Sequence, residues 1–531
     1  MSPQGGGDAG DAYHSPDSGT PVPLTNGEAT MTVAMRGDAA PSEIGGDALV
    51  VTAFERELGP AAELIDAALH GELRGMVASG ELRGGFGEVT VLRSTNGIAA
   101  RRVVVLGLGK RAVLDSYRLY NAYTFAGREL RRRRLSRVVL VADASLIGAA
   151  VPNLAALLRA LVTGTLLANF ESGVRKRDFG QIPPIEEVVV AGVDGDSDSV
   201  DAALSEAVLL ADSTLRVQRW TSEPSNSMTP TILAAAVREL CADTSLSVEV
   251  MERAELEAAG AGGLLGIARG SAEPPAMIVV RHRGGGKDDR QLALVGKGIT
   301  FDTGGISIKP SLAMEVMKSD MGGGAAVLAA MHAIATLNVR CNVTGIVPAT
   351  ENMPGGHALK PGDVVTAIDG TTIEVVNTDA EGRVVLADGL CLARRLGATH
   401  IVDVATLTGA AIIALGHVSA GLMSNDAALT KLVQRGAAEA GDRFAELPLH
   451  PEYDACLHSD VADVVNWGGR EAGAIAGGVF IRTFAGGLPW VHLDIAGTSW
   501  NDQGSLKEVP DGPSGSPVRT LVWLARFFAT E

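Results

Sequence analysis

Three segments in the second half of the sequence place carboxylates and lysines beside glycines. The first segment carries Lys297, Asp302 and Lys309, the second carries Asp320, and the third carries Asp379 and Glu381. If these segments converge, four carboxylates without cations would raise one another's pKa values and destabilise the fold. Two divalent metal ions would remove that repulsion, because carboxylates can bridge two metals about 3.5 to 4 Å apart that share a hydroxide and polarise a carbonyl or phosphoryl oxygen. The residue types therefore favour a two-metal site for hydrolysis.

Each segment also has a simpler interpretation. An Asp-x-Glu pair between a strand and a helix is more often a pair of acidic residues that the helix dipole stabilises at the N-terminus of the helix. An isolated Lys297 is more often a surface lysine. The triplet Gly322-Gly323-Gly324 would by itself be a tight connection from a strand to a helix. Spacing alone leaves both interpretations open. Gly296, Gly298, Gly304 and Gly305 are expected to allow close backbone approach and positive φ where it is needed.

The elements that must position these segments follow from the apolar pattern. In the second half, strands are expected at 277–281, 292–295, 343–347, 373–376, 400–405 and 490–495, and helices at 325–337, 384–396 and 517–528. Thr229 and Pro230 suit the cap and first turn of a further helix. In the first half, strands are expected at 48–51, 89–92, 103–106, 138–141 and 188–191, with a helix at 153–169 between them.

This alternation predicts an α/β fold with two domains, because 531 residues exceed one ordinary domain. Charged and glycine residues at 192–199 mark a boundary near residue 195, followed by helical periodicity over 200–218. We expect a disordered tail over 1–26, a smaller N-terminal α/β domain over 27–195, a linker helix over 196–222 and a larger catalytic α/β domain over 223–531. The larger domain is expected to contain a central, mostly parallel mixed sheet.

Composition excludes several classes of protein. The balance of 62 acidic against 45 basic residues, a net charge of −17, argues against nucleic acid as the main partner. Four scattered cysteines indicate neither a disulfide scaffold nor a thiolate zinc site. The first 35 residues lack the basic and apolar regions of a secretory signal, so a cytoplasmic location is expected. The uncharged stretch 404–424 contains glycine, threonine and serine, which favours a buried strand and loop over a membrane span.

Other motifs are weaker. Gly107 to Ala112 fits a variant of the dinucleotide fingerprint without its acidic partner. Gly284 to Lys287 departs from the phosphate-binding loop, and a hairpin loop is expected there. The run Arg131–Arg134 is expected to be the solvated end of a helix, and His492 a hydrogen-bonded core or interface residue.

The third segment, Asn377-Thr378-Asp379-Ala380-Glu381-Gly382-Arg383, resembles the signature of the leucyl aminopeptidases, also called cytosol aminopeptidases. Further matches follow in the same order. They are Val295-Gly296-Lys297-Gly298, Phe301-Asp302-Thr303-Gly304-Gly305, Met317-Lys318-Ser319-Asp320-Met321, Asn352-Met353-Pro354 and Pro361-Gly362-Asp363. The resemblance extends from about Glu223 to the C-terminus.

The resemblance implies a role for each matching residue. Lys297, Asp302, Asp320 and Glu381 would bind the tighter metal ion, and Asp302, Asp379 and Glu381 the more exchangeable one. Lys309 would polarise the scissile carbonyl, Arg383 would hold a bicarbonate ion that acts as general base, and Met317, Thr406, Leu407 and Gly409 would line the pocket for the first side chain.

The same resemblance implies an enzyme that hydrolyses the first peptide bond of peptides with a free N-terminus, preferring leucine and other apolar residues. It would use two Mn²⁺ or Zn²⁺ ions, a water or hydroxide that bridges them, and the bicarbonate base. It implies a cytoplasmic homohexamer. Two alternatives are a DNA-binding regulator, which the net charge disfavours, and a two-metal phosphoesterase.

Overall fold

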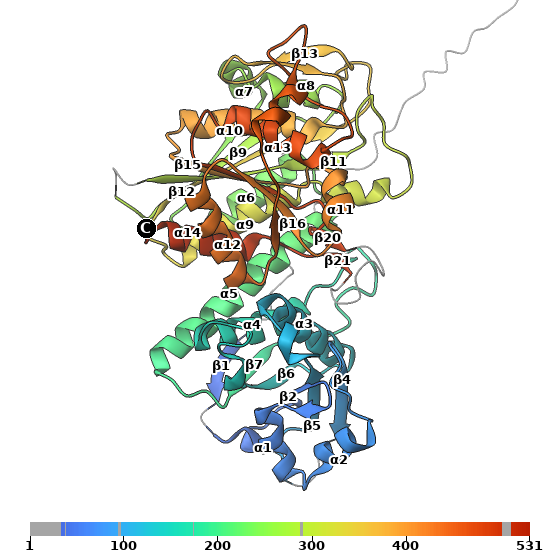
Figure 1. Ribbon diagram of the computed structural model, residues 1–531, viewed down its shortest axis with the longest axis vertical. Helices are drawn as coiled ribbons and strands as arrows, with labels where there is room; N and C mark the ends of the chain where they lie inside the picture. The colour runs from blue at the N-terminus through green and yellow to red at the C-terminus, as the bar shows by residue number, and fades with distance from the viewer. Residues whose placement is uncertain are drawn as a thin grey trace, which may run out of the picture. The chain divides into compact units, whose positions relative to one another are not determined.

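The computed structural model describes residues 33–37, 39–93, 97–173, 175–286, 290–501 and 511–530. The predicted tail over 1–26 lies outside these residues. The described chain contains alternating helices and strands in two main sheets, which confirms the predicted α/β class (Figure 1).

The N-terminal sheet has its strands in the order β1-β7-β6-β2-β5-β4, with β3 beside β2. Their bounds are β1 Val33–Gly37, β2 Ala48–Phe54, β3 Glu57–Leu58, β4 Val89–Arg93, β5 Arg102–Gly107, β6 Arg137–Val141 and β7 Glu187–Ala191. The pairs along β1-β7-β6-β2-β5 are parallel, and β4 joins antiparallel. All five strands expected in this half are present.

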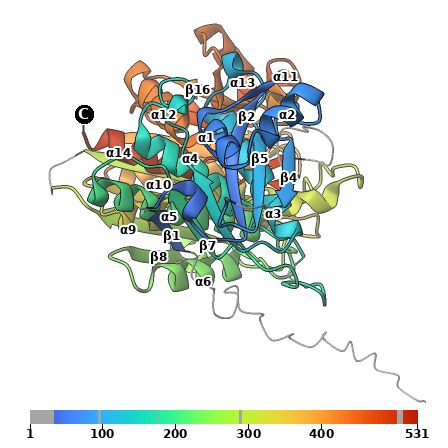
Figure 2. The same ribbon diagram turned by 90° about the horizontal axis from the view of Figure 1, so that it is seen from below.

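Helices cover this sheet (Figure 2). Their bounds are α1 Pro60–Ala68, α2 Glu72–Ser79, α3 Ser116–Arg132 and α4 Leu154–Leu167. Helix α4 begins where Asn153 accepts a hydrogen bond from the Ala156 amide, as expected for a capping residue. The prediction for Arg131–Arg134 holds for Arg132, Arg133 and Arg134, which are exposed at the end of α3, but was wrong for the first arginine. Arg131 is not solvated, because its buried guanidinium donates hydrogen bonds to the carbonyl oxygens of Ala168, Phe170, Ile182 and Pro183 and pairs with Glu171.

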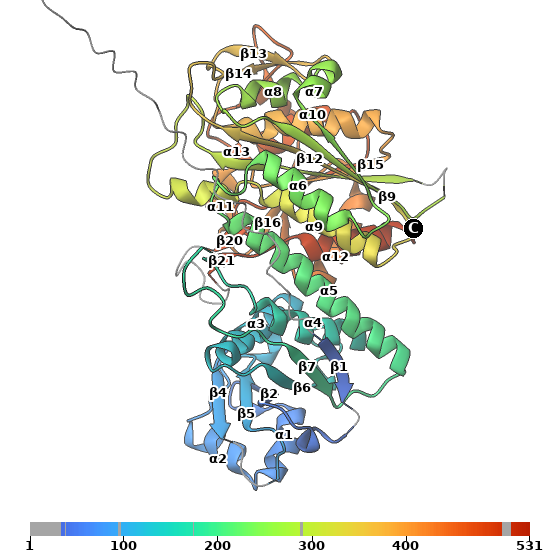
Figure 3. The ribbon, with the colours of Figure 1, turned by 180° about the vertical axis from the view of Figure 1, so that it is seen from behind.

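Helix α5, Ser197–Ser222, leads to the second sheet and packs against α4 on one side and α9, Gly322–Thr336, on the other (Figure 3). Asp196 caps it by accepting from the Ser199 amide. The helix is longer at both ends than the predicted periodicity over 200–218.

The larger sheet has its strands in the order β17-β16-β19-β15-β10-β12-β9-β8, with β11 beside β12. Their bounds are β8 Ser247–Met251, β9 Ala276–Arg283, β10 Gln291–Gly296, β11 Gly298–Asp302, β12 Asn342–Asn352, β15 His400–Ala405, β16 Ala420–Ser424, β17 Phe444–Glu446 and β19 Trp490–Asp494. The central pairs are parallel, and β8, β9 and β16 join antiparallel. The predicted mostly parallel mixed sheet is confirmed.

Helices and small sheets complete this half. The helices are α6 Pro230–Cys241, α7 Arg253–Ala259, α8 Gly262–Ala268, α10 Glu381–Arg395, α11 Gly409–Leu415, α12 Ala427–Ala440, α13 Gly473–Phe484 and α14 Val518–Phe528. The small sheets hold β13 Asp363–Thr366, β14 Thr372–Val375, β18 Val464–Val465, β20 Trp500–Asn501 and β21 Gly512–Pro513. Thr229 caps α6 through the Ile232 amide, as predicted.

Three expectations need correction or comment. The loop after β9 does not form a hairpin, because β12 lies between β9 and β10; Lys287 itself lies outside the described residues. Helix α9 begins at Gly322 rather than near Ala325, so the three glycines form its first turn. Within the described ranges, no helix is both long and apolar enough to cross a membrane. The stretch 404–424 contains the end of β15, a loop, α11 and β16.

Candidate metal and hydrolytic site

Lys297 lies between β10 and β11 with its side chain only 3 % exposed. Its Nζ lies 2.8 Å from Oδ2 of Asp320 and 2.7 Å from Oε1 of Glu381, and it donates a hydrogen bond to the carbonyl oxygen of Thr406. Asp320 ends a short 3-10 helix, η4, Met314–Ser319, and Glu381 begins α10. Three segments that are far apart in the sequence therefore meet at one buried ammonium group.

Lys309 makes a second set of ion pairs beside the first. Its Nζ lies 2.8 Å from Oδ2 of Asp302, at the end of β11, and 2.5 Å from Oδ1 of Asp379. Ligand atoms of Asp302, Asp379 and Glu381 all lie within 4.8 Å of one another. The structure thus brings together all six residues that were singled out for metal chemistry or carbonyl polarisation.

The electrostatics of this cluster are unbalanced, with four carboxylates around two ammonium groups. Burial raises the pKa of Glu381 to about 8, with Asp302 adding to the effect and Lys297 opposing it. Burial likewise raises the pKa of Asp320 to about 6. Burial alone would lower the pKa values of Lys297 and Lys309, but the surrounding carboxylates raise both above the ordinary value. The site therefore favours additional positive charge.

Asn352, at the end of β12, donates hydrogen bonds that orient the carboxylates of Asp302 and Glu381. Its Nδ2 donates to Oδ1 of Asp302 at 2.7 Å, to the Thr378 carbonyl at 3.0 Å and to Oε2 of Glu381 at 3.5 Å. The sequence motif contained Asn352, but its role was missed, because only the pairing of β11 with β12 places it there.

Thr378 joins the first and third segments. Its hydroxyl donates to the Gly304 carbonyl at 2.6 Å and accepts from the Ser307 amide at 2.8 Å. Gly304 and Gly305 have φ values of +84° and +64°, so the predicted positive φ is present at these two glycines. This turn brings Lys309 back toward Asp302.

Close packing explains other glycines of the site. A Cβ on Gly382 would lie 2.7 Å from Nζ of Lys297, and a Cβ on Gly323 would lie 2.1 Å from the Val404 carbonyl oxygen. The Gly324 amide also donates to the Lys297 carbonyl at 2.7 Å. Backbone contact between α9 and the strands therefore fixes how closely Asp320 approaches Lys297.

Arg383 lies in the first turn of α10, two residues after Glu381. Its guanidinium is buried, and Nε and Nη1 have no hydrogen-bond partner among the described residues. Burial lowers the pKa of Arg383 to about 10. Buried guanidinium donors without acceptors fit a small anion that accepts charge-assisted hydrogen bonds.

The predicted pocket residues lie on two segments beside the cluster. Thr406 and Leu407 follow β15, Gly409 begins α11, and Met317 lies in η4. The Thr406 hydroxyl donates to Oδ1 of Asp320 at 2.7 Å, a contact that sequence reasoning missed.

Buried Asp494 holds the loop that carries these pocket residues. Its Oδ1 accepts from the Leu407 amide, and its Oδ2 accepts from the Thr408 hydroxyl at 2.7 Å. Two positions before it, His492 lies fully buried in β19 with Nδ1 2.5 Å from Asp403, which confirms the predicted core histidine.

Sequence comparisons cover both halves of the chain. Residues 216–522 match the profile of the cytosol aminopeptidase family, catalytic domain, and residues 50–178 match the profile of the N-terminal domain of the same family.

Curated relatives align over most of their length. A protein of Solibacter usitatus named "Probable cytosol aminopeptidase" is 43 % identical over 91 % of this chain and 97 % of its own. A protein of Geobacter sp. with the same name is 40 % identical over 91 % of this chain and 97 % of its own.

Solved structures give the same result. The bottromycin maturation enzyme BotP superposes with a TM-score of 0.77 at 34 % identity, covering 92 % of this chain and all of that one. A second structure, BotP in complex with Mn, also has a TM-score of 0.77, at 35 % identity over 91 % of this chain and all of that one. Both domain profiles and the extent of these alignments lead to one conclusion: the chain belongs to the cytosol aminopeptidase family.

Proposed function

We propose that this protein is a metallo-aminopeptidase that hydrolyses the first peptide bond of peptides, with leucine and other apolar N-terminal residues preferred. The observation that carries the proposal is the convergence of Asp302, Asp320, Asp379 and Glu381 on Lys297 and Lys309. Membership of the cytosol aminopeptidase family supports the peptidase activity.

The donor set fits two divalent ions. Lys297, Asp302, Asp320 and Glu381 would hold one ion, and Asp302, Asp379 and Glu381 the other, so that Asp302 and Glu381 bridge. When bound, such ions lower the pKa of water and polarise a carbonyl oxygen. Carboxylates and one amine suit either Mn²⁺ or Zn²⁺, and one solved relative is described as a Mn complex. Lys297 must lose its proton to bind a metal, so metal affinity should rise with pH.

Lys309 is proposed to act on the substrate. It is half-buried, reaches the cluster from a loop, and keeps its proton because the nearby carboxylates raise its pKa. A fixed ammonium near the scissile carbonyl would stabilise the negative charge that develops on its oxygen. The α-amine of the peptide would lie among the carboxylates, which favours a free N-terminus.

Arg383 is proposed to hold bicarbonate as the general base that accepts the proton of the attacking water. The buried donors Nε and Nη1 support this role. We expect Arg383→Lys, which lacks the planar fork, to be about tenfold or more less active than the wild type once bicarbonate is added, since proton transfer typically contributes 10² to 10⁴ in rate. The measurement is kcat in bicarbonate-depleted buffer with and without added bicarbonate; equal stimulation of both proteins would contradict the role.

The remaining proposals rest on the family. Met317, Thr406, Leu407 and Gly409 would form the pocket for the first side chain. We also propose a cytoplasmic homohexamer, which light scattering on the purified protein can test.

The activity is tested by hydrolysis of leucine p-nitroanilide after loading with Mn²⁺. We expect turnover by the wild type and a loss of at least about 10³-fold in Glu381→Gln, because a bridging carboxylate is removed. The matched control is Glu257→Gln, a substitution of an exposed glutamate on α7. No turnover by the wild type, or turnover of p-nitrophenyl phosphate in its place, would refute the proposal.

A further inference from the structure

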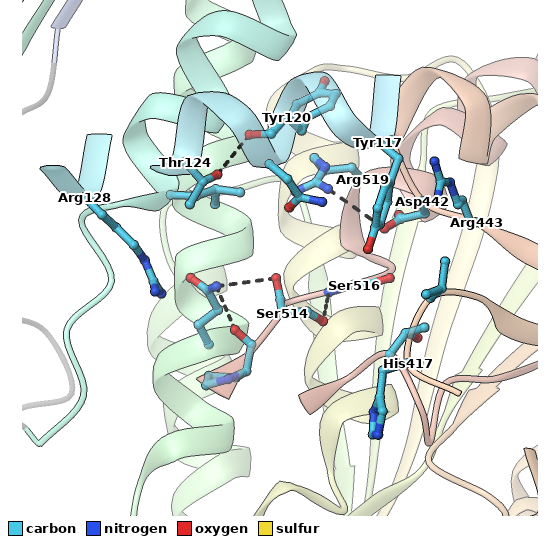
Figure 4. A pocket seen from close by; sticks show the side chains of 17 residues that line it. Tyr117, Tyr120, Thr124, Arg128, His417, Asp442, Arg443, Ser514, Ser516 and Arg519 are labelled. Atoms are coloured by element: carbon cyan, nitrogen blue, oxygen red, sulfur yellow. Dashed lines mark hydrogen bonds and ion pairs between the residues drawn. The ribbon is translucent and has the colours of Figure 1, made fainter. Parts of the chain in front are cut away.

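A second polar cavity lies away from the carboxylate cluster. It has a volume of about 80 Å³, which is room for several water molecules or one small organic molecule. Figure 4 shows Tyr117, Thr124 and Arg128 reaching it from α3, Ser514 and Ser516 from the segment after β21, and His417 from the loop before β16.

Three buried oxygen atoms in the lining lack hydrogen-bond partners among the described residues: Oε1 of Gln218, Oγ1 of Thr498 and the Tyr120 hydroxyl. Gln218, on α5, is only 7 % exposed; its Nε2 donates to the carbonyl oxygens of Pro513 and Ser514, but its Oε1 receives no hydrogen bond from any described residue. The buried Oγ1 of Thr498 likewise has no partner in the described part of the chain. Because an unsatisfied buried polar atom costs about 1 to 3 kcal/mol, these atoms indicate a ligand that donates hydrogen bonds.

Arg128, on α3, gives the cavity a positive charge that favours an anionic group on the ligand. No described residue makes an ion pair or hydrogen bond with its guanidinium; burial lowers its pKa, and the charge of Asp511 only partly opposes that effect. The other cations of the lining have partners: Arg443 pairs with Asp115 at 2.6 Å, and Arg519 lies 3.9 Å from Asp442. Among the described residues, the cavity therefore presents one guanidinium without an ion-pair partner beside acceptors without donors.

We infer that this cavity binds a small free α-amino acid, whose carboxylate pairs with Arg128 and whose ammonium donates to Gln218 and Thr498. The volume limits the ligand to one with a short side chain. The inference rests on the proposed function only for its source, because an aminopeptidase releases free amino acids. The ligand would thus be a product of the reaction that binds outside the hydrolytic site.

The experiment is equilibrium dialysis of the full-length protein with radiolabelled glycine. We expect saturable binding of one glycine per chain, weakened about 10- to 100-fold in Arg128→Gln and less in the isosteric Thr498→Val. The matched control, Arg132→Gln, changes an exposed arginine on the same helix and should bind as the wild type does. Leucine p-nitroanilide turnover by Arg128→Gln reports that the variant is folded.

Two further measurements test whether glycine binds in this cavity and whether both of its charged groups are recognised. Binding should persist in Glu381→Gln, which distinguishes this cavity from the proposed hydrolytic site and makes the result independent of turnover. Acetate, methylamine and inorganic phosphate should displace glycine at least about tenfold less well than unlabelled glycine, because each supplies only part of the contacts. Absence of saturable binding, unchanged binding in Arg128→Gln, or equal displacement by phosphate would overturn the inference.

Discussion

Two buried clusters of charged side chains in this protein differ in the ratio of acidic to basic groups. In the carboxylate cluster, Asp302, Asp320, Asp379 and Glu381 surround two lysines. The second, called here the helix cluster, joins Arg159 of α4 to Glu206 of α5 and Glu439 of α12, and Arg526 of α14 to Glu206.

The helix cluster contains two acidic and two basic side chains. Both arginines also pack on Trp523, with Cζ of Arg159 4.4 Å and Cζ of Arg526 4.8 Å from the centre of its ring. Such a set needs no further ion. The carboxylate cluster has an excess of negative charge and raised carboxylate pKa values. Charge imbalance, rather than burial of charge, therefore separates the proposed metal site from the helix cluster.

The comparison of the two clusters predicts its largest effect at Lys309, the lysine proposed to act on the substrate. Lys309→Met should lower kcat for leucine p-nitroanilide by about 10² to 10³, because a fixed positive charge near the developing oxyanion is lost. Steady-state kinetics at saturating Mn²⁺ measures the change. Lys431→Met, on the exposed face of α12, is the control. A change in KM alone would mean that Lys309 only binds substrate.

The next prediction compares the clusters directly by stability. Glu439→Gln should lower the free energy of unfolding by about 1 to 3 kcal/mol with kcat unchanged, because it leaves buried Arg159 short of a partner. Glu381→Gln should have the opposite effect on chelated protein at pH 8, since it removes one member of a repelling set. Thermal unfolding in the presence of a chelator measures both. If both variants lose stability equally, the contrast in balance has no energetic consequence.

A smaller effect is the dependence on pH. Glu381 and Asp320 bind a proton more tightly in the folded chain than in the unfolded chain, so folding stability of chelated protein should fall as pH rises from about 5 to 8. The two lysines do not alter this slope, because their stabilising effect is fully present below their unfolded pKa near 10.5. With Mn²⁺ the slope should reverse, since protons compete with the metal for its ligands.

The measurement for this prediction is the unfolding temperature at several pH values, with and without Mn²⁺. Glu381→Gln should flatten the slope of the chelated protein. His492, which also has a raised pKa because Asp403 outweighs the effect of burial, is present in both proteins and cancels in the comparison. An identical slope in the variant would exclude Glu381 as its source.

Much of the architecture was accessible from the sequence because the signals are local. Apolar runs predicted the central strands of both main sheets but not β1, β3, β8, β11, β16 or β17. The motif around Asp379 and Glu381 marked the start of α10. What failed depends on contacts between distant segments. Arg131 looks like a surface arginine in sequence, but carbonyl groups at 168–170 and 182–183 surround its guanidinium. The contribution of Asn352 likewise depends on strand pairing, which spacing does not reveal.

The seam between α9 and the larger sheet has a consequence for engineering. At Gly296, Gly323 and Gly324 the main chain of the helix rests on the main chain of the strands, where a Cβ would lie within 3 Å of neighbouring atoms. Interatomic distances set by main-chain contact do not depend on how side chains repack. Substitutions at the proposed pocket residues Met317 and Leu407 would therefore leave this contact unchanged, whereas the three seam positions should be kept constant from the outset.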